Sequence, residues 1–168
     1  MIIIDASSII LLAKASILET VTGIDKVLIS DGVYKEVSRG KETGKPDSLL
    51  LERLLQEGKI NLKTADKSSV DSLKKSFGIF AGENETISIA QETGARFVLI
   101  DDRKGINVCK ALNLPFMTAI DVNIDLYENK LITFQKALDS FEKIKKFGWI
   151  GQDILDSREK RLKERRSG

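Results

Sequence analysis

Residues 97–103 have the sequence FVLIDDR, in which four apolar residues precede two adjacent aspartates and an arginine. A short apolar run of this kind is typical of a strand that is buried on both faces, as in the centre of a parallel sheet. Two neighbouring carboxylates are hard to ionise together, because each charge raises the pKa of the other. Two interpretations are open: the aspartates cap the next helix, or they bind a cation.

Along the rest of the chain, short apolar runs alternate with helical patterns, which indicates a mostly parallel sheet covered by helices on both faces. Strands are expected at 97–100 and in four further segments: IIID at 2–5, VLIS at 27–30, INLKT at 60–64 and PFMTA at 115–119. The last third of the chain has helical spacing. We therefore predict a single three-layer α/β/α domain over residues 1–168 with about five strands. Its α/β core would span 1–120, and a C-terminal helical extension would span 121–168.

Polar residues next to the helical patterns predict where helices begin and end. The residues expected at helix starts are Ser7 or Ser8, Asp47 or Ser48, and Asp66. Gly40 is expected to end the helix formed by DGVYKEV.

The composition is that of an ordinary globular protein, with 42% hydrophobic and 31% charged residues among 168. No apolar run approaches the roughly 20 residues that cross a bilayer, and the N-terminus lacks an export signal, so we expect a cytoplasmic protein without membrane contact. The single cysteine, Cys109, cannot form an internal disulfide and is expected to be a small buried apolar residue rather than a nucleophile.

The chain contains no histidine. This absence excludes Ser-His-Asp triads, Cys-His dyads, His-pair ribonucleases and His-ligated zinc sites. No GxxxxGK[ST] or GxGxxG motif follows an expected strand, so the usual signatures of nucleotide cofactors are absent too. Any chemistry must use carboxylates, Lys, Ser, Tyr, the one Cys or a bound ion.

Positive charge is concentrated at the C-terminus. The net charge is +2, but REKRLKERR at 158–166 holds six basic and two acidic residues, which leaves the remainder at −2. Basic residues suit the last turns of a helix because they stabilise its dipole, and we favour this structural interpretation over a nucleic-acid contact.

Three aspartates follow expected strands. Asp5 ends the first strand, and Asp101 and Asp102 follow the fourth. Ligands of open parallel sheets bind beyond the carboxyl ends of the strands, where the strand order reverses. If these two strands are central neighbours, the three carboxylates converge on one edge of the sheet.

Two glutamates on helices are expected to face the same edge. Glu36 borders the apolar stripe that contains Val33 and Val37, and Glu83 opens a helix on the face that points inward. Glu85 falls on a different face of that helix. Each acid has a structural alternative, as a helix cap, a surface residue or a first-turn dipole residue.

Taken together, the acids indicate a cation, since carboxylates gathered in a partly dry cleft repel one another unless an ion offsets their charge. With oxygen ligands and without His or paired Cys, the ion is expected to be Mg²⁺ or Mn²⁺. The candidate ligands and catalytic residues are Asp5, Glu36, Glu83, Asp101 and Asp102.

Four motifs occur in order along nearly the whole chain: IIIDASS with Asp5 and Ser7, VYKEV with Glu36, AGENETISIA with Glu83, and VLIDDR with Asp101 and Asp102. In these motifs the chain resembles the PIN domain family of metal-dependent nucleases, and especially its prokaryotic VapC-like members. The segment KFGWIG in the helical tail is similar to one branch of that family. The third acid is Glu, where many of the toxins have Asp.

The resemblance implies a Mg²⁺- or Mn²⁺-dependent endoribonuclease that hydrolyses RNA phosphodiester bonds, with Asp102 in the main position of the fourth motif and Asp101 assisting. Ser7 would orient Asp5 or a water molecule, and Arg103 and Lys104 are candidate phosphate contacts. The resemblance also implies the toxin of a type II toxin–antitoxin pair, a cognate antitoxin as partner, and a homodimer.

Two other classes of function are alternatives to a nuclease. The first is a catalytically weak or inactive nucleic-acid-binding module, in which the basic tail supplies the affinity. The second comprises doubly wound signalling domains and haloacid-dehalogenase-like phosphatases, which need acids at other places; Ser7 stands where the phosphatases have a second Asp. Tyr34 and Trp149 are isolated aromatics, too few in the sequence to indicate base stacking.

Overall fold

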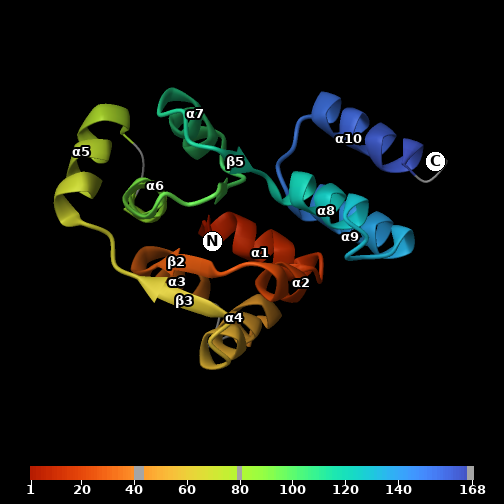
Figure 1. Ribbon diagram of the computed structural model, residues 1–168, viewed down its shortest axis with the longest axis horizontal. Coiled ribbons are helices and arrows are strands. Elements are labelled where there is room, and N and C mark those ends of the chain that lie inside the picture. Colours follow the sequence, from red (N-terminus) through yellow and green to blue (C-terminus); the bar gives the residue numbers. More distant parts are fainter. Residues whose placement is uncertain (40–43, 79–80, 166–168) are drawn as a thin grey trace.

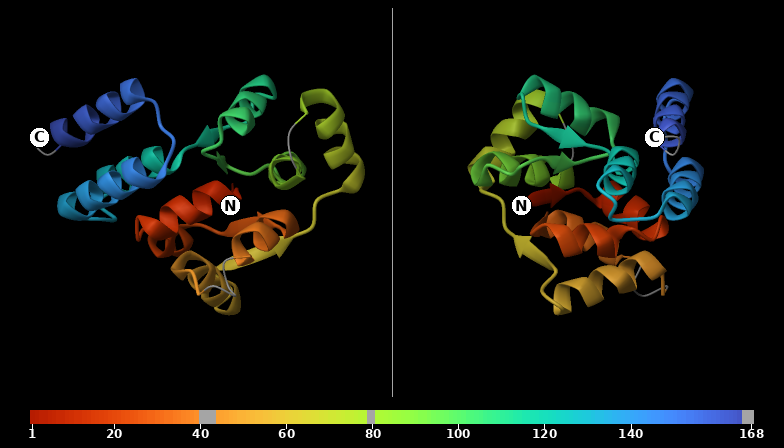
Figure 2. Two further views of the ribbon diagram at one scale, coloured as in Figure 1. Left: turned by 180° about the vertical axis from the view of Figure 1, so that it is seen from behind. Right: turned by 45° about the vertical axis from the view of Figure 1, so that its right-hand side comes forward.

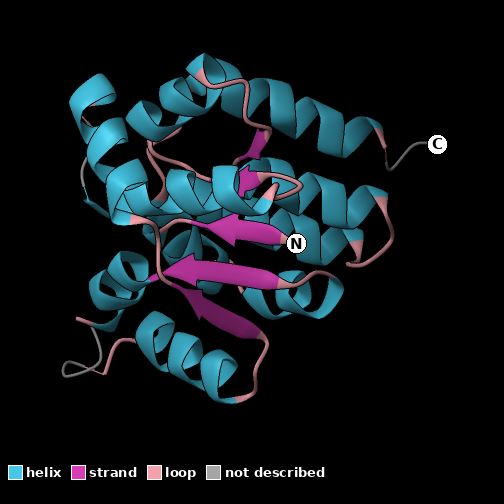
Figure 3. Ribbon diagram, turned by 60° about the vertical axis from the view of Figure 1, so that its left-hand side comes forward, coloured by secondary structure: helices cyan, strands magenta, loops and turns pink. Residues whose placement is uncertain are grey.

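The strands of the sheet are parallel and pair in the order β3-β2-β1-β4-β5. This is seen in the computed structural model of the protein, in which residues 1–39, 44–78 and 81–165 are described. The strands are β1 (Ile2–Ile4), β2 (Val27–Ser30), β3 (Ile60–Lys63), β4 (Val98–Leu99) and β5 (Phe116–Met117). Figure 3 shows the arrows of the first three pointing the same way. The predicted parallel sheet is thereby confirmed.

β1 and β4 are neighbours in the centre of the sheet. This is the condition under which Asp5, Asp101 and Asp102 were expected to share one edge. Ile3 pairs with Val98 and Ile4 with Leu99, and all four side chains are buried. The chain runs from β1 to β2 and β3 on one side, and returns to β4 and β5 on the other. The strand order therefore reverses between β1 and β4, which is where ligands of such sheets bind.

Helices cover both faces of the sheet (Figure 1), as predicted for a three-layer α/β/α fold. One face carries α1 (Ala6–Lys14), α2 (Leu18–Ile24), α3 (Asp31–Ser38), α4 (Pro46–Gln56), α8 (Ala119–Glu128) and α9 (Phe134–Phe147). The other carries α5 (Lys67–Phe77), α6 (Ala81–Thr93) and α7 (Arg103–Ala111). The last helix, α10 (Gln152–Glu164), packs on α8 and α9.

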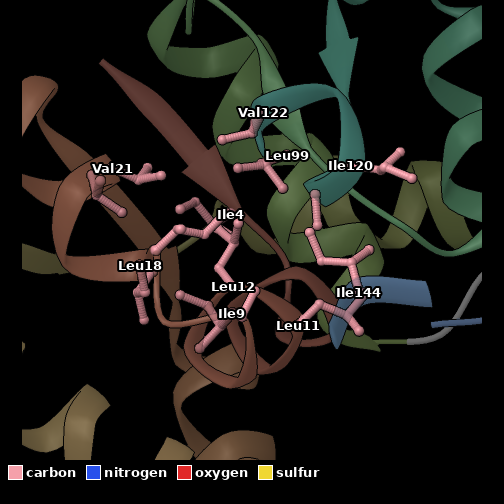
Figure 4. Packing of buried hydrophobic residues seen from close by; sticks show 14 of the residues in the cluster. Ile4, Ile9, Leu11, Leu12, Leu18, Val21, Leu99, Ile120, Val122 and Ile144 are labelled. Carbon is pink, nitrogen blue, oxygen red and sulfur yellow. The ribbon is translucent and has the colours of Figure 1, made fainter. Parts of the chain in front are cut away.

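The alternation of side chains along β1 divides the core into two clusters. Ile2 and Ile4 belong to the cluster under α1, whereas Ile3 belongs to the cluster under α6 and α7. Figure 4 shows Ile4 beside Leu12 and Ile9 of α1. The first cluster also contains Ile144 and Leu162 from the C-terminal helices. These helices therefore share a hydrophobic core with the sheet, although they gather at one end of the molecule, opposite α5 (Figure 2).

Helix caps were predicted with mixed success. Asp66 caps α5 by accepting a hydrogen bond from the Ser69 N–H, as expected. The prediction of Ser7 or Ser8 for α1 was wrong, because Asp5 is the cap. The prediction of Asp47 or Ser48 for α4 was also wrong. That helix begins with a proline, which has no N–H to satisfy, and no side chain caps it. The expected stop at Gly40 lies outside the described residues.

The outer strands are shorter than the apolar runs predicted. PFMTA was expected to be extended through residue 119, but β5 ends at Met117. Thr118 caps α8 in a capping box with Asp121, so Ala119 is already helical. The local chemistry of the helix start therefore ends the strand.

Gly105 shows how tightly α7 packs on β4. A Cβ at this buried position would lie 2.2 Å from Cδ1 of Ile100, a side chain that is itself fully buried. We expect Gly105→Ala to lower the free energy of unfolding by about 1–3 kcal/mol in urea denaturation. Gly23→Ala is the matched control, because nothing lies within 4 Å of its added Cβ. Equal destabilisation of the two variants would contradict the tight packing of α7 on β4 at Gly105.

Across the described ranges, no single helix is long and apolar enough to cross a membrane. Only α1 and α2 taken together pass a test of length and composition, as a pair bent by 113°.

Candidate metal centre

The aspartates that follow β1 and β4 stand at the carboxyl edge of the sheet. Asp5 directly follows β1, and its N–H still donates to the carbonyl of Leu99 at 3.0 Å. Asp101 and Asp102 follow Ile100, which donates to the carbonyl of Met117. Strand hydrogen bonding therefore continues up to the first acid on each strand, which places both turns at the same level of the sheet.

A cavity of about 220 Å³ opens at this edge, and it brings together four of the five candidate acids. Its lining residues are Asp5, Ala6, Ser7, Val33, Glu36, Gly82, Glu83 and Asp102. The four acids come from four separate places along the chain. We call this hollow the acidic cavity.

Asp5 is the most buried acid of the cavity, with 3% of its surface exposed. Burial raises the pKa of its carboxyl from 3.8 to about 7, against hydrogen bonds that lower it. Those bonds come from the N–H of Ser8 and the hydroxyl of Ser7, both at 2.8 Å. The contact expected from Ser7 to Asp5 is thus present. A carboxylate in this position is costly to ionise, and a bound cation would offset that cost.

Glu36 and Glu83 approach the cavity from two helices that pack together, α3 and α6. Oε2 of Glu36 lies 3.6 Å from the place of a Cβ on Gly82, so the carboxylate of α3 sits against the start of α6. Glu83 is half-buried in the first turn of α6. The positive end of that helix dipole favours negative charge at this point.

Glu85 has a role that the sequence did not indicate. Its Oε2 accepts a hydrogen bond of 2.7 Å from the N–H of Gly32, in the first turn of α3. A Cβ at Gly32 would lie only 2.6 Å from the same oxygen. Glu85 therefore ties α6 to the helix that carries Glu36. The spacing of the acids along α6 shows only that Glu85 is on another face, and not what that face meets.

Asp102 caps α7 and also lines the acidic cavity. Its Oδ1 accepts hydrogen bonds from the N–H groups of Lys104 and Gly105, at 2.7 and 3.1 Å. The two interpretations of this residue, helix cap and cation ligand, are thus compatible in one side chain, because capping occupies only one of the two carboxylate oxygens.

Asp101 is the one candidate acid that the structure does not bring into the acidic cavity. Its carboxylate accepts from the hydroxyl of Ser8 at 2.6 Å and from the N–H of Ala119 at 3.0 and 3.1 Å. Successive residues after a strand point to opposite sides, so Asp101 faces the start of α8 while Asp102 faces the cavity. Burial raises the pKa of Asp101. Both aspartates of FVLIDDR thus bind helix N-termini, although they bind different helices.

The donor set fits a hard divalent cation, since the lining acids supply oxygen ligands alone. In the part of the chain that the structure describes, however, no three or more acidic or Cys side chains are close enough to hold a metal ion as they stand. The acids surround the cavity rather than converge on one point. The proposed Mg²⁺ or Mn²⁺ therefore rests on the chemistry of the donors and on the cost of burying Asp5.

The two candidate phosphate contacts, Arg103 and Lys104, are exposed in the first turn of α7, directly after Asp102. Arg103 lines a larger hollow that adjoins the acidic cavity. Their contact with phosphate stays a prediction.

Comparison with known protein families gives an independent assignment. The model of the family DUF3368, described as a PIN domain, matches residues 1–164. A search of curated proteins found no match. PIN domains are generally nucleases and typically use divalent metals. The match covers nearly the whole chain, including every lining residue of the acidic cavity, and the chain belongs to the PIN domain family.

Proposed function

We propose that the protein is a Mg²⁺- or Mn²⁺-dependent endoribonuclease that hydrolyses RNA phosphodiester bonds. The observation that carries this proposal is the acidic cavity, which four carboxylates from separate segments line at the point where the strand order reverses. A structural role for each acid alone does not account for their common location.

The ion would be held by Asp5, Glu36, Glu83 and Asp102. When bound, such an ion lowers the pKa of a water molecule and offsets the negative charge that builds on the phosphate. Ser7 keeps Asp5 oriented by donating to it, and the N–H groups at the start of α7 hold Asp102 in place. The first turn of α6 adds its dipole beside Glu83.

The binding-module alternative gains little support from the structure. Its affinity would come from the basic tail, but among the described residues the tail arginines pair with acids of α8 and the tail lysines pair with glutamates of α10 itself. Arg158 pairs with Asp121 at 2.6 Å, and Arg161 makes a two-pronged contact with Glu128 at 2.7 and 2.8 Å. This contact holds the pKa of Glu128 below its usual range. These contacts give the tail a structural role, because they dock α10 on α8.

Within this proposal the nuclease acts as the toxin of a type II toxin–antitoxin pair and forms a homodimer. The support is the resemblance of its motifs to those of VapC-like proteins. Its partner would be an antitoxin peptide that presents an Arg or Lys to the acidic cavity. A neighbouring reading frame whose product inhibits the nuclease is what this role requires.

Metal removal tests the proposed activity. Purified protein is expected to cleave mixed single-stranded RNA with Mn²⁺ or Mg²⁺, to lose cleavage in EDTA, and to regain it when excess Mn²⁺ is added. Denaturing gels of end-labelled RNA measure the rate. Cleavage that continues unchanged in EDTA would contradict the proposal.

Two glutamates of α6 provide a matched pair for the same assay. Glu83→Gln is expected to slow cleavage by at least about tenfold, which corresponds to a loss of about 1.4 kcal/mol of transition-state stabilisation. Glu85→Gln should have a smaller effect, because it lies outside the acidic cavity and glutamine still offers an oxygen to Gly32.

A further inference from the structure

A second hollow, of about 480 Å³, adjoins the acidic cavity. Its lining residues are Ser7, Ile10, Leu11, Asp101, Asp102, Arg103, Phe147, Gly148 and Trp149, and we call it the Trp149 groove. Ser7 and Asp102 line both hollows. A molecule lying in the groove would therefore lie next to the proposed metal centre.

Trp149 stands out because it is fully exposed, at 103% of its reference surface. It lies between α9 and α10. The preceding residue, Gly148, has little room for a side chain, because a Cβ there would lie 2.9 Å from the carbonyl oxygen of Ile144. The indole therefore contributes nothing to the core, although aromatic side chains usually stabilise a protein by burial. Phe147, next to the same groove, is 44% exposed. Both aromatic side chains line the groove, so their exposed surface is available to a ligand there.

Positively charged side chains lie in and beside the Trp149 groove. Arg103 is exposed there, and within the described ranges no acid forms an ion pair with it. Lys14 and Lys146 lie over the ring of Phe147, at 4.7 and 5.4 Å from its centre. Unlike the cations of α10, these groups remain available to an anionic ligand.

An exposed aromatic face beside free cations is the combination that binds single-stranded nucleic acid, since every base has a face to stack and every nucleotide a phosphate. We propose that the Trp149 groove holds one nucleotide of a single-stranded RNA, with its base stacked on Trp149 and a phosphate facing Arg103. The next phosphate then reaches the acidic cavity. The inference rests on the proposed function for the identity of the nucleic acid.

The position of Trp149 in the fold revises the interpretation of the aromatics. In the sequence it is an isolated residue, 47 positions after Asp102. In the structure it shares a groove with that aspartate. A base in a duplex has both faces covered by its neighbours, so the groove selects unpaired RNA.

The chain offers a direct probe of this site, because Trp149 is its only tryptophan. Intrinsic fluorescence therefore reports on this one indole. Wild-type protein in EDTA is titrated with a short single-stranded RNA and, separately, with the same RNA in a blunt duplex; gels verify that the RNA stays intact. We expect saturable quenching by the single strand and little by the duplex. Equal quenching by both would contradict the proposed selection.

Substitutions then test whether the contact supplies affinity. Trp149→Ala is expected to weaken binding of the single strand by about tenfold or more, measured by fluorescence anisotropy of labelled RNA, and Trp149→Phe to recover most of it. The melting temperature should stay unchanged in both variants, because the side chain is fully exposed. Unchanged affinity in Trp149→Ala would overturn the inference.

Failure of the groove and failure of the nuclease are distinguishable. If RNA quenches Trp149 but no metal supports cleavage, the groove stands and the proposed activity fails. If cleavage depends on Mn²⁺ while Trp149→Ala changes neither affinity nor rate, the activity stands and the groove fails. If RNA leaves the fluorescence unchanged and Trp149→Ala converts a dimer to a monomer in size-exclusion chromatography, the groove is a protein interface and the inference is wrong.

Discussion

Asp5→Asn is expected to abolish metal-dependent cleavage of RNA and, at the same time, to stabilise the metal-free protein. Both effects have one cause, which is the removal of a buried negative charge. That charge would bind the metal ion, and without the ion it destabilises the fold. Burial raises the pKa of Asp5 from 3.8 to about 7. Asparagine has nearly the same shape, keeps an oxygen for the Ser8 N–H, and carries no charge to bury.

The stability effect depends on pH in a defined direction. Because the pKa of Asp5 is raised in the folded state, the unfolded chain releases this proton at lower pH than the folded protein does. The stability advantage of metal-free Asp5→Asn over the metal-free wild type should therefore grow as the pH rises from about 4 to about 7, and then stay level. Above that range we expect Asp5→Asn to be more stable by about 1–3 kcal/mol.

Thermal denaturation between pH 4 and 8, in EDTA and with Mn²⁺, measures these effects. Mn²⁺ should raise the melting temperature of the wild type, since a ligand that binds only the folded state stabilises it, and should have little effect on Asp5→Asn. Asp71→Asn is the control, because this exposed acid of α5 lies outside the acidic cavity. An Asp5→Asn protein that cleaves RNA normally, or that is less stable than wild type at pH 8, would contradict the assignment.

The central part of the fold was predictable because its signals are local. The buried runs IIID and VLIS need no tertiary context to be recognised as strands, and the acid at the end of each central strand follows from the chain itself. The order of strands then determines that Asp5 and Asp102 meet. Sequence spacing therefore predicted four acids that line one cavity.

What escaped prediction depends on contacts between distant segments. Asp101 binds Ser8 and Ala119, and nothing in FVLIDDR indicates that the start of a later helix lies within reach. Glu85 meets Gly32 from a helix more than 50 positions away. Trp149 becomes a candidate binding residue only because α9 ends beside Asp102. Such relations arise when helices pack, and the local pattern does not encode them.

The adjacent aspartates of FVLIDDR should give unequal losses when each is changed to asparagine. Asp102→Asn is expected to abolish Mn²⁺-dependent cleavage without destabilising the protein, because asparagine caps a helix about as well as aspartate and can still accept from Lys104 and Gly105. What it loses is the negative charge that faces the acidic cavity.

Asp101→Asn should slow cleavage by about tenfold or less. The carboxylate of Asp101 binds Ser8 and the start of α8, so it affects the acidic cavity only indirectly, by positioning these neighbours. Asp101→Ala is the informative companion. It leaves the N–H of Ala119 without its acceptor, and should cost about 1–3 kcal/mol of stability.

Rates of RNA cleavage with Mn²⁺ and urea denaturation of all three variants separate the two roles. If Asp102→Asn loses cleavage while its free energy of unfolding stays that of the wild type, Asp102 acts as a metal ligand. If the Asp101 variants lose cleavage in proportion to their loss of stability, Asp101 acts as a positioning residue. Equal loss of cleavage in Asp101→Asn and Asp102→Asn, at equal stability, would instead place both carboxylates at the metal. In that case Asp101 would have to give up its bonds to Ser8 and Ala119 when the ion binds.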